Sequence, residues 1–172
     1  MTLDQRTDFA GVELDDSRPA VIDQNGCTIS RAELAVRAEE FGSRLGDTRR
    51  LVFLEAAQTA DALAAYIACR QGRHPVLLYG SNDRDRIAPL VERYGPNAMI
   101  TATREKSRIT WLCRDEIELH AELGVLLSTS GSSGSPKLVK LSHANLDSNA
   151  RAIASYLGLD SSERALLALR FN

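Results

Sequence analysis

The sequence predicts an α/β fold with a mainly parallel sheet flanked by helices. Short apolar segments alternate with helical patterns of ten or more residues between positions 19 and 172. Connections of that length carry the chain across a sheet and return it parallel to the previous strand. A run of small residues, 129–135, follows one apolar segment directly. That position corresponds to the carboxyl end of a strand, where open α/β sheets bind ligands.

Composition places the chain among ordinary globular domains. It has 172 residues, 44% of them apolar and 26% charged, enough for a single domain with one core. The polar residues 1–18 are expected to form a loose leader before a domain at 19–172. A net charge of −2 argues against a nucleic-acid binder. The three cysteines, Cys27, Cys69 and Cys113, are far apart and indicate reduced thiols.

Nothing in the sequence indicates export or a membrane span. The longest apolar helical run, 62–69, is far shorter than a membrane crossing requires. The first residues lack the apolar core of a targeting segment. We therefore expect a cytoplasmic protein.

The first elements have clear boundary signals. Residues 21–23 and 28–30 flank Asn25-Gly26, a pattern typical of a short hairpin. Ser30 and Glu33 form a capping box that begins a helix, and Gly46 ends it. Within that helix Leu34, Phe41 and Leu45 recur at helical spacing and should face the core.

A strand–helix–strand–helix series follows. The apolar segments 51–54 and 75–79 predict buried strands on either side of an alanine-rich helix at 59–70. On that helix Leu63, Tyr66 and Ile67 share one side. The next helix has an apolar face of Ile87, Leu90, Val91 and Tyr94 and closes at Gly95-Pro96. Pro89 should delay its start or kink it.

The remaining elements surround the run of small residues. Strands are expected at 98–101, 109–112, 124–128 and 138–141. Ser142 should cap a helix that carries Leu146, Ile153 and Leu157 and ends before Gly158. The apolar segment 165–169 predicts one more buried strand.

The segment from Thr129 to Lys137 has the chemistry of a phosphate-binding loop. Its glycines allow close approach of backbone N–H groups, and its hydroxyls and lysine add further donors. It fits neither the Walker loop, the dinucleotide fingerprint nor the nucleophile elbow, because each requires a glycine where this chain has another residue. A flexible Gly/Ser linker is the plain alternative. The flanking apolar strands and the terminal Pro136-Lys137 favour a ligand loop.

The loop also resembles a known signature. Thr129-Ser-Gly-Ser-Ser-Gly-Ser-Pro-Lys137, continuing to Ser142-His143 and Asn145, is similar to the phosphate loop of the AMP-forming adenylate synthetases. That superfamily includes acyl-CoA synthetases, which this chain resembles most, adenylation domains of peptide synthetases, and luciferases. One departure is Leu138, where the family usually has glycine. Weaker similarity to the first part of the family's large N-terminal domain covers the segments 19–26, 29–34, 50–54, 65–70, 74–78 and 86–91.

The resemblance implies an activity. Members of the family join a carboxylic acid to ATP, accompanied by Mg²⁺, to give an acyl-adenylate and pyrophosphate. Most then pass the acyl group to a thiol such as coenzyme A. Lys137 would stabilise the leaving pyrophosphate, and no other catalytic residue and no protein metal ligand is assigned. The residues expected to bind the nucleotide are Thr129, Ser130, Gly131, Ser132, Ser133, Gly134 and Lys137.

The family is several times longer than this chain, so the resemblance implies an N-terminal fragment without turnover of its own. Its partners would be ATP, a carboxylic acid and the missing C-terminal portion. Two other classes remain open. A non-catalytic scaffold with a degenerate adenylation fold is compatible with Leu138, whereas a phosphatase or P-loop nucleotidase is disfavoured by the failed motif counts. His143 is interpreted as part of a helix cap, and His74 and His120 have no ligand spacing.

Overall fold

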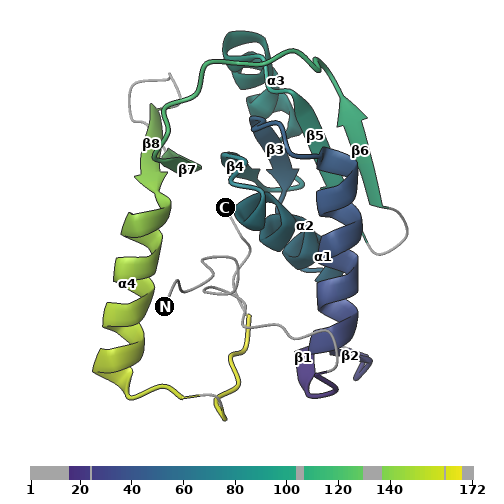
Figure 1. Cartoon of the computed structure of the whole chain (residues 1–172), viewed down its shortest axis with the longest axis vertical. Coiled ribbons are helices and arrows are strands. Elements are labelled where there is room, and N and C mark those ends of the chain that lie inside the picture. Colours follow the sequence, from purple (N-terminus) through teal and green to yellow (C-terminus); the bar gives the residue numbers. More distant parts are fainter. Residues whose placement is uncertain (1–15, 24, 104–106, 130–136, 161, 168–172) are drawn as a thin grey trace.

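A computed structural model describes residues 16–167, apart from positions 24, 104–106, 130–136 and 161. Six strands form one sheet in the order β6-β5-β3-β4-β7-β8. The four inner strands are parallel to one another, and β6 and β8 lie antiparallel at the two edges. The predicted α/β class and mainly parallel sheet are confirmed (Figure 1).

The first elements that the structure describes are the predicted hairpin and capped helix. Strands β1 (Pro19–Ile22) and β2 (Thr28–Ser30) pair antiparallel as a separate small sheet. Helix α1 (Arg31–Leu45) has the predicted capping box, in which Ser30 and Glu33 each accept a bond from the other's backbone N–H. It ends at Gly46, whose φ of 73° favours glycine.

Asp16, just before the hairpin, is held by hydrogen bonds, while the leader expected at 1–18 stays a prediction. The Asp16 side chain is buried, and its carboxylate accepts a hydrogen bond from Arg18 at 2.6 Å. The backbone carbonyl of Asp16 accepts one from the N–H of Ala32 in α1. The bond with Arg18 lowers the pKa of Asp16 to about 2. Residues 1–15 lie outside the described part of the chain.

The central elements follow the prediction closely. Strands β3 (Val52–Glu55) and β4 (Val76–Tyr79) flank helix α2 (Ala60–Gln71), which Thr59 caps. The buried side chains of α2 are mostly alanines and lie on more than one side of the helix, whereas Leu63 and Tyr66 of the predicted face are only partly buried. Helix α3 (Arg84–Tyr94) starts five residues before Pro89, which overturns the expected late start.

The last elements build the far side of the sheet. Strands β5 (Ala98–Ala102), β6 (Ser107–Trp111), β7 (Leu123–Thr129) and β8 (Lys137–Ser142) lead into helix α4 (His143–Leu157). Gly158 ends α4 in the left-handed conformation, as predicted. No residue of α4 is buried, and Tyr156 is 89% exposed. The predicted strand at 165–169 is wrong for its described residues, because 165–167 form no strand and Leu166 is 91% exposed.

Alternation along the strands produces a core on each face of the sheet. Val52 and Leu54 face α1 and α2, whereas Phe53 between them faces α3. This period of two is what a strand buried on both faces requires. Helices α1 and α2 therefore cover one face, and α3 covers the other (Figure 1).

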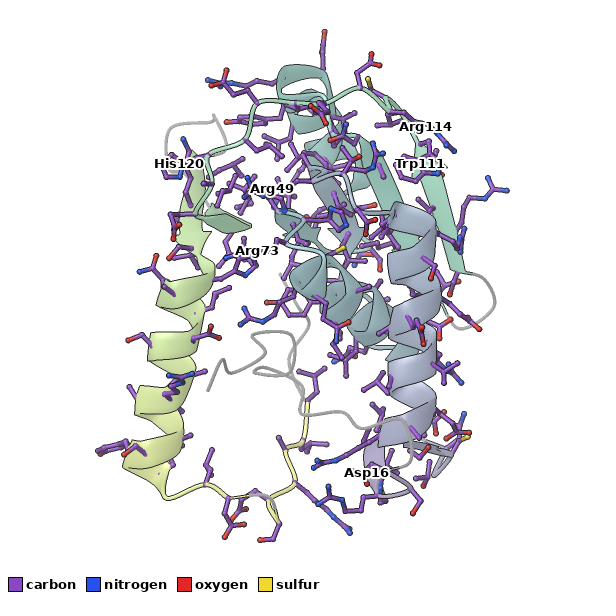
Figure 2. The ribbon with its side chains drawn as sticks, in the orientation of Figure 1. Asp16, Arg49, Arg73, Trp111, Arg114 and His120 are labelled. Carbon is purple, nitrogen blue, oxygen red and sulfur yellow. The ribbon has the colours of Figure 1, made fainter. Side chains whose placement is uncertain are left out.

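Arg49 and Arg50, just before β3, hold the connection 112–122, which forms no helix or strand. The Arg49 guanidinium donates hydrogen bonds to the carbonyls of Leu119, His120 and Leu123. Arg50 donates to the carbonyl of Arg114, and the two arginines lie on the Trp111 ring, 5.0 and 4.7 Å from its centroid. Figure 2 labels Arg49, His120, Trp111 and Arg114 within this region.

Candidate functional site

The candidate site lies at the carboxyl edge of the sheet. Strands β3, β4 and β7 are parallel, so their last residues Glu55, Tyr79 and Thr129 lie at the same edge. The loop 130–136 leaves β7 there and returns through β8. Open α/β sheets bind ligands outside the carboxyl ends of their strands, so Thr129, where the predicted loop begins, lies at a suitable edge.

The two ends of the loop are held by strand pairing. Thr129 is the partner of Lys137 in the β7–β8 ladder, and Ser128 is the partner of Leu138. The structure therefore brings together the backbones of the first and last predicted site residues. The other five, Ser130, Gly131, Ser132, Ser133 and Gly134, lie outside the described residues. The phosphate-binding role of all seven stays a prediction.

Leu138, the departure from the family pattern, is part of a regular strand. Its side chain is half-buried and packs against the core on the α3 face, which includes Leu126. A glycine would contribute no such contact and would weaken an edge strand. Leu138 therefore stabilises the exit from the loop, and the backbone from Lys137 to Ser142 follows the ladder.

Two polar side chains at the carboxyl edge were not singled out from the sequence. The Glu55 side chain at the end of β3 is buried, at 2% exposure. The Thr59 hydroxyl donates to the carbonyl of Ala102 at 2.7 Å and also caps α2. The sequence signal for Glu55 was an acidic residue at the end of an otherwise apolar strand.

The described residues offer little other chemistry. They contain no group of three or more His, Cys, Asp or Glu side chains that could hold a metal ion. The cysteines are free, and burial raises the pKa of the Cys69 thiol to about 12, so that thiol is not a nucleophile. No helix in the described part of the chain is long and apolar enough to cross a membrane.

One cavity is lined by residues remote from β7 and β8. It has a volume of about 530 Å³ and is lined from α1 by Arg37 and Phe41, together with Asp61 and Ser107. Asp61 is held there by an ion pair with Arg37 at 2.6 Å and by the Ser107 hydroxyl. None of the lining residues belongs to β7, β8 or α4, so this cavity is not the predicted phosphate site.

His143 and His74 lie where they contribute to the packing of the fold. His143 is the first residue of α4, as the cap interpretation expected, and its ring lies near Arg70 of α2. Burial, and then Arg70, lower the pKa of His143. His74 is buried and accepts a hydrogen bond from the backbone of Arg50. Neither ring has the partners of a catalytic base.

Solved structures share this fold. The O-succinylbenzoate coenzyme A synthetase MenE from Bacillus subtilis, in complex with AMP, superposes with a TM-score of 0.68 and 20% identity, covering 96% of this chain and 48% of its own. ATP-bound MatB from Rhodopseudomonas palustris gives a TM-score of 0.58 and 24% identity, covering 83% and 35%. The chain therefore spans about half, or less, of the synthetases that it matches.

Sequence comparison leads to the same group. Two curated proteins from Claviceps purpurea, both named D-lysergyl-peptide-synthetase subunit 1, are 27% identical over 128 and 127 residues, 60% of this chain and 4% of theirs. No family model matches the chain. The chain is a partial-length match to the N-terminal part of the AMP-forming adenylate and acyl-CoA synthetase superfamily, and the predicted resemblance is confirmed at that level.

Proposed function

We propose that this chain is the N-terminal part of an ATP-dependent ligase that activates a carboxylic acid as an acyl-adenylate and then passes the acyl group to coenzyme A or a carrier thiol. The supporting observation is the pairing of β7 with β8, in which Thr129 and Lys137, the two ends of the small-residue run, lie opposite each other at the carboxyl end of β7. The same fold occurs in synthetases solved with AMP and with ATP.

The loop suits the charge that this reaction develops. When the carboxylate attacks the α-phosphorus, negative charge moves onto the departing pyrophosphate. Donors around the β- and γ-phosphates therefore help most in the transition state. Ser130, Ser132 and Ser133 would supply hydroxyls, Thr129 would begin the loop, and Gly131 and Gly134 would present N–H groups. Lys137 would place its ammonium group at the terminal phosphates, and Mg²⁺ would be held mainly by phosphate oxygens and water.

The fragment alone should bind ATP weakly and turn nothing over. Each well-made charged hydrogen bond contributes about 1.5–3 kcal/mol. Binding must first offset at least about 4 kcal/mol of lost translational and rotational freedom. Two or three such contacts, with no adenine or ribose pocket, correspond to a Kd of about 1 mM or weaker. We place the protein in the cytoplasm, where its free cysteines stay reduced and ATP is abundant.

The test uses this chain joined to the remaining portion of its ligase. We expect carboxylate-dependent release of pyrophosphate, and Lys137→Ala should lower that rate by about 100-fold, as loss of one transition-state donor does. Lys140→Ala is the matched control, because Lys140 lies three residues farther along β8 and is exposed. An equal rate in the Lys137 and Lys140 variants would remove the assigned role. No pyrophosphate release from the complete protein would favour the non-catalytic scaffold.

A further inference from the structure

Arg70 joins helix α2 to the start of helix α4. Its side chain is 12% exposed, and its guanidinium donates to Oδ1 of Asp147 at 2.6 Å. A second guanidinium nitrogen lies 3.2 Å from Nδ1 of His143. His143 and Asp147 are four residues apart in α4 and therefore share one face of the helix. One planar cation thus contacts two consecutive turns.

His143 in turn lies against β7. A Cβ atom built on Gly124 would come within 3.0 Å of both the backbone nitrogen and Nδ1 of His143. Glycine at this position is what allows the ring to approach the strand. A guanidinium can only donate, so Nδ1 of His143 is the acceptor and the neutral ring holds its proton on Nε2. Among the described residues Nε2 is buried and has no hydrogen-bond partner.

These contacts lie at the base of the hairpin that carries the phosphate loop. Leu123 of β7 is the ladder partner of Ser142, immediately before α4, and Thr129 is the partner of Lys137 at the other end. Strand β8 is an edge strand paired with β7 alone, and no residue of α4 is buried. Two side-chain contacts join α4 to α2, and Arg70 makes both of them.

We propose that Arg70 is a positioning residue for the phosphate loop, through a brace that consists of its contacts with His143 and Asp147. The brace fixes the start of α4 and the register of β8 on β7, and that register sets where Lys137 leaves the loop. A slip of one residue would turn each β8 side chain to the opposite face of the sheet. The printed contacts of Arg70 are with the first turns of α4, at the base of the hairpin, so the role proposed for it is positioning and not catalysis. Its effect on nucleotide rests on the proposed function.

Amide hydrogen exchange of the 172-residue chain tests the brace directly. In Arg70→Gln the ladder amides of β7 and β8 should exchange about tenfold faster, the effect of losing one charge-assisted hydrogen bond. The ladder amides of β3 and β4 are the internal reference and should change much less. Arg73→Gln is the matched control, because it removes a neighbouring exposed charge and leaves the contacts to Asp147 and His143 in place. Equal exchange in the two variants would overturn the proposal.

Three further variants, two single and one double, extend the comparison. Asp147→Asn removes the anion from the exposed helix α4. If Arg70→Gln fails to fold, this variant should show the same faster exchange of the β7 and β8 amides relative to those of β3 and β4. Combining Asp147→Asn with Arg70→Gln should add little to Arg70→Gln alone, because each change breaks the same bond. Arg70→Lys should recover only part of the protection, since an ammonium group lacks the two-pronged geometry. Fully additive effects of the two changes would contradict the brace.

A titration with Mg-ATP of this chain joined to the remaining portion of its ligase, followed through amide chemical shifts of β7 and β8, tests the link to the loop. The affinity should fall several-fold in Arg70→Gln and stay unchanged in Arg73→Gln. If the wild type responds to ATP and Arg70→Gln responds equally, Arg70 does not position the loop. If the wild type gives no response, the proposed function fails while the exchange experiment still decides the brace.

Discussion

The backbone N–H of Arg50 donates to Nδ1 of the buried His74 ring at 3.1 Å. An acceptor nitrogen cannot hold a proton, so this bond requires a neutral imidazole. Burial, and then the neighbouring charge of Arg50, lower the pKa of His74, while a hydrogen bond with the backbone of Gly46 opposes them. The join between α2 and β4 is therefore built around an uncharged histidine.

Acid should destabilise the protein through this ring. Because the pKa of His74 is lower folded than unfolded, the unfolded chain binds more protons below about pH 6.5. The free energy of unfolding should therefore fall as the pH drops from 7 to 5, by at most about 1.4 kcal/mol per pH unit for one proton. His143 acts in the same direction.

Urea unfolding at pH 7 and pH 5 checks this. His74→Asn keeps an acceptor for the Arg50 N–H but cannot be protonated, so its stability should depend less on pH. His120→Asn, on an exposed histidine, is the control. A slope as steep in His74→Asn as in the control would contradict the assignment.

Gly72 lies against the same His74 ring. A Cβ atom there would lie 2.6 Å from Nε2 of His74, whose ring is buried and cannot move aside. Gly72→Ala should cost about 1–3 kcal/mol of unfolding free energy, as other overpacking changes do. Gly42→Ala in α1 should have the opposite sign, a gain of about 0.5–1 kcal/mol, because nothing lies near its added methyl group.

Denaturant unfolding of both glycine variants, alone and with His74→Ala, separates the causes. Once the imidazole is gone, the cost of Gly72→Ala should largely disappear. A cost that persisted would place the strain in the backbone, not in the ring.

Asn97 is fully buried and satisfies two backbone groups. Its Oδ1 accepts from the N–H of Leu51 at 2.8 Å, and its Nδ2 donates to the carbonyl of Asp115 at 2.7 Å. Asn97→Ala should destabilise by about 1–3 kcal/mol because both groups lose a partner. Asn97→Asp should cost more at pH 7, where it buries a charge against a carbonyl, and should regain stability as acid protonates it.

Thermal or denaturant unfolding across pH measures these changes, with the exposed Asn149→Ala as the control. An Asn97→Asp variant that lost stability on acidification more steeply than the wild type would show that the carboxyl is not held beside the Asp115 carbonyl.

Local signals explain most of what the sequence predicted. The Ser30–Glu33 box, the Asn25-Gly26 turn and the uninterrupted apolar segment at 51–54 each specify a boundary or a strand from a few neighbouring residues. The loop at 129–137 was found in the same way, and strand pairing places its two ends together. Its side chains lie outside the described residues, so its chemistry stays a prediction.

Contacts distant in sequence left no such signal. Arg70 and Asp147 are 77 positions apart, and Leu51 and Asn97 are 46 apart, so neither pair produces a periodic pattern. In the segment 165–169 the sequence instead predicted a strand that the structure does not show for the described residues. Its apolar run predicts a buried strand, but burial requires a covering surface, and its described residues are exposed.

Arg49 has a consequence for how this chain can vary. Its guanidinium binds carbonyl oxygens of the connection 112–122 and of Leu123, and every amino acid has such an oxygen. Substitutions at the exposed positions of the connection should therefore be tolerated during evolution while its course over the sheet stays the same, whereas Ile117 and Leu119 pack against the core. Position 49 has no such freedom, because the compact ammonium group of lysine lacks the separate, planar nitrogens with which Arg49 reaches these carbonyls.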